Sequence, residues 1–335
     1  MQSKLLKNYI LFASILVLLL NGCSTKEVFE PTVVGDDWDR YESAEGTIVD
    51  TSLNVAQLDN EKLITKSTVI NLDTNETQRA VSHSGGWLVL ATIDGKVSLI
   101  SEHDTTLQED FDLKKTIAGA SVKDDTLAVI FADNEIALYD IPSKAILFKE
   151  QGTKYIAADS RIVNPHFMNG IVLFATLDGK IILVNQKANK RLRTVIVSSE
   201  DNFNNIISMN IVDNKIIAAT AYKILSMSQK EVRAKYEIRD VAYDEQNIYI
   251  ATKQGEVISL TPDLQVNLKV KFPFAHFYGI ISNEDKLYLL EKEGYLIVVD
   301  KKTFQYTIHE VDIDDGFIFI ADKLFYVDDE KILTE

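Results

Sequence analysis

The feature that most constrains the fold is a stretch of fifteen residues that the chain contains twice. Residues 86–100 read GWLVLATIDGKVSLI and residues 170–184 read GIVLFATLDGKIILV, with seven identical positions. Each copy has two apolar runs joined by Asp-Gly, a dipeptide that tolerates the positive φ required in two-residue hairpin turns. The runs are rich in Val, Ile and Leu and alternate little, which is typical of strands covered on both faces. The stretch therefore predicts a repeated β-hairpin within stacked sheets.

Weaker copies of this pattern occur along the rest of the chain. Each begins with a polar pair, continues with an apolar run and ends, after a polar break, with a second apolar run. The mean spacing of about 36 residues leaves room for a strand before each pair, such as Ile238–Tyr243, and one after each second run, such as Arg193–Val197. The second residues of the eight pairs are Glu61, Gly86, Asp125, Gly170, Asn214, Asn247, Asp285 and Asp315.

Four antiparallel strands per repeat are typical of a propeller blade. We therefore predict an all-β fold, a β-propeller of four-stranded antiparallel blades, with eight blades favoured and seven as the alternative. The first interval, of 25 residues from Glu61 to Gly86, is too short for a complete blade. Pairing of an N-terminal strand with C-terminal strands would close the ring and cover its edges.

Composition excludes several functional classes. The chain of 335 residues has 35 Lys and Arg against 50 Asp and Glu, a net charge of −15. Such a chain repels phosphate backbones, so nucleic acid is not expected as a partner. The single cysteine, Cys23, excludes an intrachain disulfide and a Cys-rich metal site. The five histidines lack the HExxH spacing of a zinc site, and no nucleophile elbow or phosphate loop is present, so the chain is not predicted to be an enzyme.

The N-terminus has the pattern of a bacterial lipoprotein signal peptide. Lys4 and Lys7 precede an apolar run from Tyr9 to Leu20 that is short for a transmembrane helix. The sequence LNGC that ends at Cys23 resembles a lipobox. The resemblance implies cleavage before Cys23 and acylation of its thiol and new amine, for example by palmitate, which together anchor a protein stably to a membrane.

These signals divide the chain into three parts. Residues 1–22 are predicted to be the signal peptide, residues 23–57 the lipidated cysteine with an acidic tether, and residues 58–335 the propeller domain. The tether contains eight acidic residues with Pro and Gly between them, although residues 47–49 could add a strand to the domain. Ser24, which follows the cysteine in place of Asp, favours the outer membrane.

The repeat Ala-Thr-x-Asp-Gly-Lys resembles the PQQ-like repeat of quinoprotein-type propellers. A lipobox ahead of such a propeller resembles the BamB-like lipoproteins of the outer-membrane β-barrel assembly machinery, over residues 58–335. The closing Trp of the usual repeat is absent, because Trp38 lies in the tether and Trp87 begins a strand. Cysteines and a Trp platform for a quinone are also missing, so no cofactor is expected beyond the lipid on Cys23.

The resemblance implies a non-enzymatic scaffold on the periplasmic face of the outer membrane. Its partners would be the β-barrel insertase with its complex and unfolded outer-membrane proteins. In BamB-like proteins an Arg before a Pro-containing strand and acidic residues in the next long loop contact the partner. The matching residues are Arg161, ahead of Pro165, and Glu200 and Asp201 in the loop 198–205. A solvated loop arginine is the alternative for Arg161.

A second functional class remains open, an anchored ligand-binding or metal- or quinone-dependent propeller that acts through its central channel. His83 and His166 each shortly precede a polar pair, so both are predicted on innermost strands that face the channel. The one basic run, residues 187–193, is expected to be a solvated turn between strands, with a lipid- or partner-facing patch as the alternative.

Overall fold

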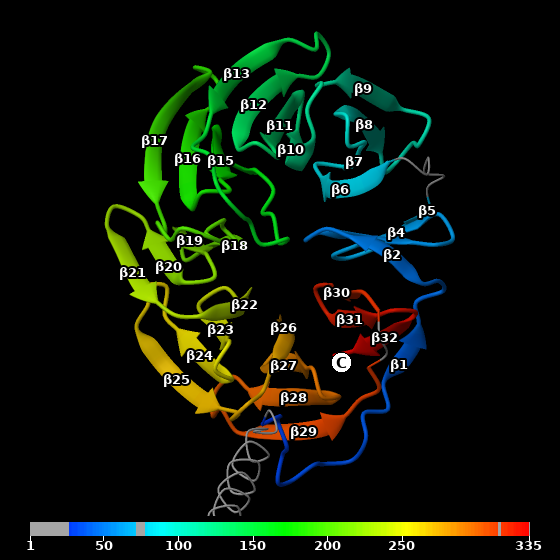
Figure 1. Ribbon diagram of the computed structural model, residues 1–335, viewed down its shortest axis with the longest axis vertical. Helices are drawn as coiled ribbons and strands as arrows, with labels where there is room; N and C mark the ends of the chain where they lie inside the picture. Colours follow the sequence, from blue (N-terminus) through cyan, green and yellow to red (C-terminus); the bar gives the residue numbers. More distant parts are fainter. Residues whose placement is uncertain (1–26, 72–77, 314–315, 335) are drawn as a thin grey trace, which may run out of the picture.

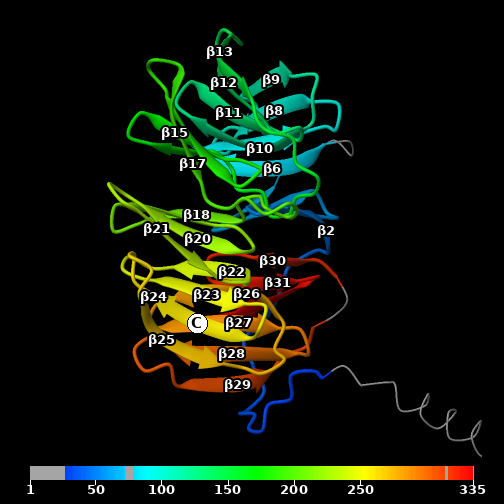
Figure 2. The ribbon, with the colours of Figure 1, turned by 60° about the vertical axis from the view of Figure 1, so that its left-hand side comes forward.

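The computed structural model describes residues 27–71, 78–313 and 316–334. Its strands form eight four-stranded antiparallel sheets arranged in a ring (Figure 1), which confirms the predicted eight-bladed β-propeller. Figure 2 shows the blades as successive layers, with β22–β25 next to β26–β29. None of the described residues forms a helix that is long and apolar enough to cross a membrane. The predicted signal peptide and Cys23 lie outside the described residues.

Each blade runs from an innermost strand at the centre of the ring to an outermost strand at its rim. The first four blades comprise β2 Ile48–Thr51, β3 Val55–Leu58, β4 Lys62–Thr65 and β5 Val69–Asn71; β6 Arg79–Ser84, β7 Trp87–Ala91, β8 Lys96–Ser101 and β9 Gln108–Asp112; β10 Ile117–Lys123, β11 Thr126–Phe131, β12 Glu135–Asp140 and β13 Ile146–Gln151; and β14 His166–Met168, β15 Ile171–Ala175, β16 Lys180–Asn185 and β17 Lys190–Ile196.

The last four blades comprise β18 Ser208–Val212, β19 Lys215–Ala219, β20 Lys223–Met227 and β21 Glu231–Lys235; β22 Ile238–Tyr243, β23 Ile248–Thr252, β24 Glu256–Leu260 and β25 Val266–Lys271; β26 Phe277–Asn283, β27 Lys286–Glu291, β28 Tyr295–Asp300 and β29 Tyr306–Glu310; and β30 Ile318–Ile320, β31 Leu324–Val327, β32 Glu330–Leu333 and, from the N-terminus, β1 Tyr41–Ser43.

The predicted Asp-Gly turns are present, but their geometry differs from the predicted two-residue hairpin. Four residues join β7 to β8 and β15 to β16, and only the glycine has a positive φ, 91° at Gly95 and 82° at Gly179. The Asp178 carboxylate accepts a hydrogen bond of 2.6 Å from the Thr176 hydroxyl, which itself accepts one of 3.0 Å from the Lys180 amide. The repeated Thr, Asp, Gly and Lys therefore all serve the turn between the second and third strands.

The middle strands of the blades are buried on both faces, as their lack of alternation predicts. All six residues of β11 and all five of β23 are buried. Apolar side chains of one blade pack against those of the next, for example Val89 and Leu99 against Val129 and Ala137. The core is therefore a series of apolar layers between adjacent blades rather than one central mass.

The structure corrects the phase of the two terminal repeats. In six blades the predicted polar pair joins the first and second strands, but Asn60-Glu61 joins β3 to β4, the second and third strands of the first blade. The last predicted repeat supplies the first and second strands, β30 and β31, rather than the second and third; its pair Asp314-Asp315 lies outside the described residues. The 25-residue first interval is short because the first blade begins upstream, at Ile48, in the segment where residues 47–49 were expected to add a strand.

The ring closes by pairing its two chain ends, as predicted. β1 runs antiparallel to β32, with Tyr41 opposite Ile332 and Ser43 opposite Glu330. The last blade therefore takes three strands from the C-terminus and its outermost strand from the N-terminus, seen in Figure 1 as blue β1 beside red β32. This pairing satisfies the backbone groups that an open ring would expose at its two ends.

The segment before β1 also packs on the propeller. Phe29 is only 4% exposed, and its ring meets those of Phe272 and Tyr295 edge to face, at centroid distances of 6.2 and 5.6 Å. The Gly35 amide donates a hydrogen bond of 2.7 Å to the Ile308 carbonyl. Figures 1 and 2 both show this blue segment beside β29. The propeller therefore starts well before the predicted boundary and includes most of the segment predicted as a tether.

Candidate functional site

The centre of the ring contains a cavity of about 980 Å³. Besides the innermost strands, residues 65–67 and 321–322 line it. Two inward segments line it as well, the turn 52–54 of the first blade and residues 160–165 of the loop between the third and fourth blades. Leu53 of that turn crosses the ring and packs against the apolar cluster of the fourth and fifth blades, which includes Val163. In Figure 1 the green chain before β15 extends into the centre of the ring, toward the end of β2. The channel is thus narrowed by these two segments.

Arg161 lies in this inward loop and is held by internal hydrogen bonds. Its Nε and Nη2 donate to the two carboxylate oxygens of Asp159 at 2.8 and 2.6 Å, and its Nη1 donates to the Arg239 carbonyl of the sixth blade. Burial by itself raises the pKa of Asp159, but the hydrogen bonds and charge of Arg161 outweigh it and hold that pKa below its usual value. Arg161 therefore lines the cavity as a fixed, 24% exposed side chain rather than as a solvated loop arginine.

The next long loop, residues 197–207, holds the loop of Arg161 in place. Asn205 is fully buried; its Oδ1 accepts a hydrogen bond of 2.6 Å from the Asp159 amide, and its Nδ2 donates to the carbonyls of Asp159 and Arg161 at 3.2 and 3.1 Å. The Phe203 amide adds a bond of 3.0 Å to the Ala157 carbonyl. Sequence reasoning missed Asn205, although an Asn pair directly before the apolar residues 206 and 207 was visible.

Glu200 and Asp201 lie in this second loop but do not pair with Arg161. Glu200 forms an ion pair of 3.2 Å with Lys223 of the fifth blade and is 42% exposed, and Asp201 is exposed. Arg161 pairs with Asp159 instead. The structure therefore joins the two predicted loops through Asn205 and leaves their predicted charged side chains apart.

Buried charges of both signs line the cavity near Arg161. Burial lowers the pKa of Lys66, whose ammonium donates to the Ile320 carbonyl and lies 5.0 Å from the centroid of the Phe319 ring. Burial raises the pKa of Asp240, although this carboxylate accepts a hydrogen bond of 3.0 Å from the Ile280 amide. The cavity is thus a polar site in which burial disfavours the charged forms of both Lys66 and Asp240.

The two predicted channel histidines, His83 and His166, do lie on innermost strands, β6 and β14, and line the cavity. His83 is hydrogen-bonded to Glu102, and burial together with the charge of Lys123 lowers the pKa of His166. Among the residues that the structure describes, no group of three or more His, Cys, Asp or Glu side chains is placed to hold a metal ion.

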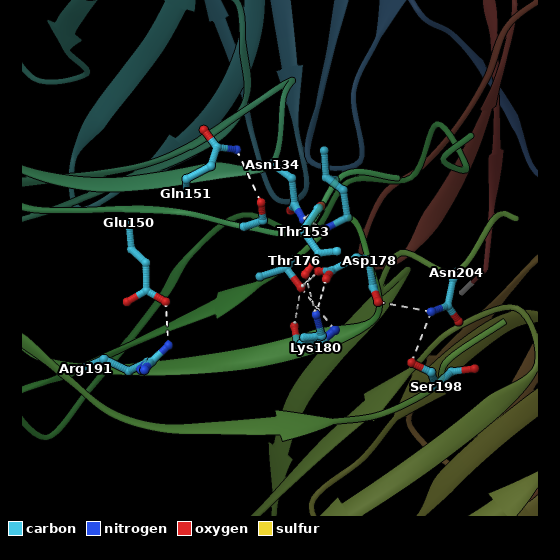
Figure 3. A network of polar contacts seen from close by, with 12 residues as sticks. Asn134, Glu150, Gln151, Thr153, Thr176, Asp178, Lys180, Arg191, Ser198 and Asn204 are labelled. Atoms are coloured by element: carbon cyan, nitrogen blue, oxygen red, sulfur yellow. Dashed lines mark hydrogen bonds and ion pairs between the residues drawn. The ribbon is translucent and has the colours of Figure 1, made fainter. Parts of the chain in front are cut away.

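The basic run 187–193 forms the outermost strand β17 from Lys190 onward, so only its first residues are the predicted turn. Arg191 pairs with Glu150 at 2.7 Å, as Figure 3 shows, and Arg193 pairs with Glu231. The arginines of the run therefore join the rims of adjacent blades.

Replacing Arg161 by alanine is expected to lower the free energy of unfolding by about 1–3 kcal/mol, because the Asp159 carboxylate would lose both guanidinium donors. Replacing a solvated loop arginine would cause no such loss of stability. Urea unfolding of the two proteins at pH 7 measures this difference.

The same contact has a defined pH dependence. Because the pKa of Asp159 is held below its unfolded value, roughly 3.9, its stabilising effect is complete above that value and is lost as the pH falls through the folded pKa. The stability difference between wild type and the Arg161→Ala variant should shrink on acidification. A difference that stays constant down to strongly acidic pH would contradict this assignment.

The propeller is similar in sequence to known proteins. The model of the KIB1-4 β-propeller matches residues 57–324. The chain is 34% identical over 247 residues to the plasminogen-binding protein PgbB of Helicobacter pylori strain J99, covering 71% of this chain and 46% of that protein. It is 33% identical to PgbB of strain 26695, covering 71% and 45%. The chain thus spans about half the length of the curated relatives it matches.

Among solved structures, BamB from Moraxella catarrhalis superposes with a TM-score of 0.64 over 91% of this chain and 98% of that chain. At 13% sequence identity this likeness shows a shared propeller fold and nothing further. This likeness confirms the predicted BamB-like fold. The sequence relatives carry the name PgbB rather than BamB, so the predicted BamB-like role stays a prediction. Because the family model spans most of the propeller, this chain belongs to the KIB1-4 β-propeller family.

Proposed function

We propose that this chain is a non-enzymatic protein-docking propeller that is held at a membrane by lipid on Cys23. The observation that carries the proposal is the pair of long loops, 152–165 and 197–207, locked together by Asn205. Both loops join the outermost strand of one blade to the innermost strand of the next, so both lie on the same face of the propeller. Loops fixed on a rigid scaffold are the usual means by which such folds present a binding surface.

We further propose that this face docks on the β-barrel insertase of the outer membrane and its complex, and that the bound propeller assists unfolded outer-membrane proteins from the periplasmic side. The lipobox sequence, Ser24 and the fold-level likeness to BamB support this partner. Glu200 and Asp201 are exposed on the second loop and would contact the partner directly. Arg161 would act through the shape of its loop, because its guanidinium is bonded internally.

A gentle detergent pull-down of the full-length protein from native membranes, followed by mass spectrometry, tests this proposal. We expect enrichment of a large outer-membrane barrel with periplasmic repeats, and loss of that barrel in an Asn205→Ala variant. Recovery of a periplasmic enzyme or a small ligand in its place would favour the alternative function, ligand binding or catalysis through the central cavity.

The membrane anchor gives a separate prediction. Replacing Cys23 by alanine is expected to move the protein from the membrane to the soluble fraction, because the acyl chains supply the stable attachment. The propeller should remain folded, since Cys23 lies ahead of the first described contacts. Cell fractionation with immunodetection measures the shift, and thermal unfolding measures the fold. A variant that stays in the membrane fraction would show that the anchor is something other than lipid on Cys23.

A second candidate function is binding of plasminogen. It is favoured by the two Helicobacter pylori relatives, which are named plasminogen-binding proteins and are 34% and 33% identical to this chain. The chain spans about half of each relative, so the activity transfers only if the shared half carries it. Surface plasmon resonance of the full-length protein, in mild detergent, over immobilised plasminogen decides this. Saturable binding would support the function, and no binding would assign it to the half of the relatives that this chain does not cover.

A further inference from the structure

All eight blades have a matching residue pair between their third and fourth strands, and in the fifth blade the residues of this pair are unusual. In every blade the first residue of the third strand lies opposite an end residue of the fourth strand. In the sixth blade this pair is Glu256 and Lys271, two opposite charges, but in the fifth blade it is Lys223 and Lys235. The six other pairs contain no like charges: Lys62–Asn71, Lys96–Asp112, Glu135–Gln151, Lys180–Ile196, Tyr295–Glu310 and Glu330–Ser43. Like charges directly opposite on antiparallel strands destabilise a sheet, so this pair needs a further reason.

The two lysines line a groove between the fourth and fifth blades. The groove has a volume of about 440 Å³; Arg233 and Ala234 line it beside Lys235, and its other wall is the chain from Ile196 to Ser199. Arg233 is already paired, with Glu231 at 2.6 Å and with the Ile196 carbonyl at 2.7 Å. Lys223 forms its ion pair with Glu200, whereas Lys235 has no ion-pair partner among the residues that the structure describes. The groove therefore contains an uncompensated ammonium group beside one that an internal carboxylate already neutralises.

A buried hydroxyl adds an independent indication of a ligand. Ser198 lines the groove and is only 2% exposed, yet its Oγ has no hydrogen-bond partner. Its backbone is fixed, because Asn204 Nδ2 donates bonds of 3.0 Å to the carbonyls of both Ser198 and Asp178, as Figure 3 shows. A buried hydroxyl without a partner costs stability, so its presence requires an explanation, and a group that binds in the groove would supply the missing hydrogen bond.

We propose that this groove binds a carboxylate side chain from an acidic segment of a protein partner. The Lys223 and Lys235 ammonium groups would neutralise the carboxylate, and the Ser198 hydroxyl would donate a hydrogen bond to it. The ion pair between Glu200 and Lys223 in the free protein shows that a carboxylate suits this site. Glu200 thus acts as an internal competitor that the carboxylate of the partner displaces.

The inference deepens the proposed docking function and rests on it, because the groove adjoins the loop 197–207 of the docking face. The protein as a whole is acidic, with a net charge of −15. At physiological ionic strength charges more than about 8 Å apart are largely screened, so the charged groups at the groove decide what it binds. Lys223 and Arg233 are paired there with Glu200 and Glu231, which leaves the positive charge of Lys235.

Fluorescence anisotropy with a short labelled peptide of alternating Asp and Ser tests the proposal on the full-length protein in mild detergent. The matched peptide carries Asn in place of Asp. We expect saturable binding of the acidic peptide alone, weakened by added salt. Lys235→Ala should weaken binding roughly fivefold or more, whereas Lys271→Ala, the same position in the sixth blade, should leave it unchanged.

Two further variants separate binding from folding. Glu200→Gln should tighten peptide binding a few-fold, because the internal competitor is removed. Ser198→Ala should weaken binding while the melting temperature stays the same or rises, because the variant no longer buries an unpaired hydroxyl. Lys235→Ala should likewise not lower the melting temperature, since it removes a like-charge pair.

The proposal is overturned if both peptides bind equally, or if Lys235→Ala binds the acidic peptide as well as Lys271→Ala does. It is also overturned if inorganic phosphate competes as well as the peptide at equal concentration, because the groove would then be a general small-anion site. In the membrane pull-down, loss of the partner with Asn205→Ala but not with Lys235→Ala would leave the docking function standing and exclude the groove from it.

Discussion

Replacing Phe29 by alanine is expected to lower the free energy of unfolding by about 3–5 kcal/mol, the range for a fully packed aromatic side chain. Phe29 is 4% exposed and packs edge to face on Phe272 and Tyr295, in the apolar cluster between the sixth and seventh blades. The loss combines the removed apolar contacts with the cavity that rigid neighbours cannot fill. Denaturation by urea, followed by tryptophan fluorescence, measures it.

A control in the same segment makes this result specific. Val33 is 77% exposed, so Val33→Ala should leave the stability unchanged within about 0.5 kcal/mol. If Phe29→Ala were as stable as Val33→Ala, the segment before β1 would be a tether, as its acidic composition predicts, and not a part of the propeller.

Replacing Asn205 by alanine is expected to lower the free energy of unfolding by about 3 kcal/mol, because several buried backbone groups lose their partners at once. The Asp159 amide and the carbonyls of Asp159 and Arg161 all bond to this one side chain. The loop 152–165 should also open, since its link to the loop 197–207 is removed. Limited proteolysis should then cleave this loop, and urea unfolding should show the loss of stability.

Two variants bracket this prediction. Asn202→Ala, at an exposed position of the same loop, should behave as wild type. Asn205→Asp should fall at or below the alanine variant, because a carboxylate cannot donate to the two carbonyls and would be charged in a buried position. A stable Asn205→Ala variant with a protease-resistant loop would mean that the two loops are held together by other contacts.

The features that were predictable are those set within one repeat. The Thr-x-Asp-Gly-Lys turn, the glycine with positive φ and the apolar runs buried on both faces all depend on residues close together in the chain, such as Thr176, Gly179 and Lys180. Because that unit recurs, the sequence also predicted the blade and the number of blades. The phase of the first and last repeats was wrong, because a polar pair marks a turn without saying which two strands of a blade it joins.

The candidate site was predictable only in part. The sequence identified the two loops and predicted that His83 and His166 face the channel, since the order of the strands within a blade determines these positions. It did not reveal that Arg161 is bonded internally, that Asn205 joins the loops, or that Lys223 and Lys235 face each other. These facts depend on which side chains of different blades meet, and nothing local in the sequence records that.

The sequence by itself determined the all-β propeller of this protein, because turn chemistry and strand burial are short-range properties that repeat along the chain. Only the tertiary structure decided how the ring closes, with the Trp38 indole donating a hydrogen bond of 3.1 Å to the Leu333 carbonyl, 295 positions away. It also decided that Phe29 belongs to the core and that Arg161 lines the cavity. The physical reason is that such contacts gain their energy from burial and hydrogen bonding between distant segments, which exist only once the blades are assembled.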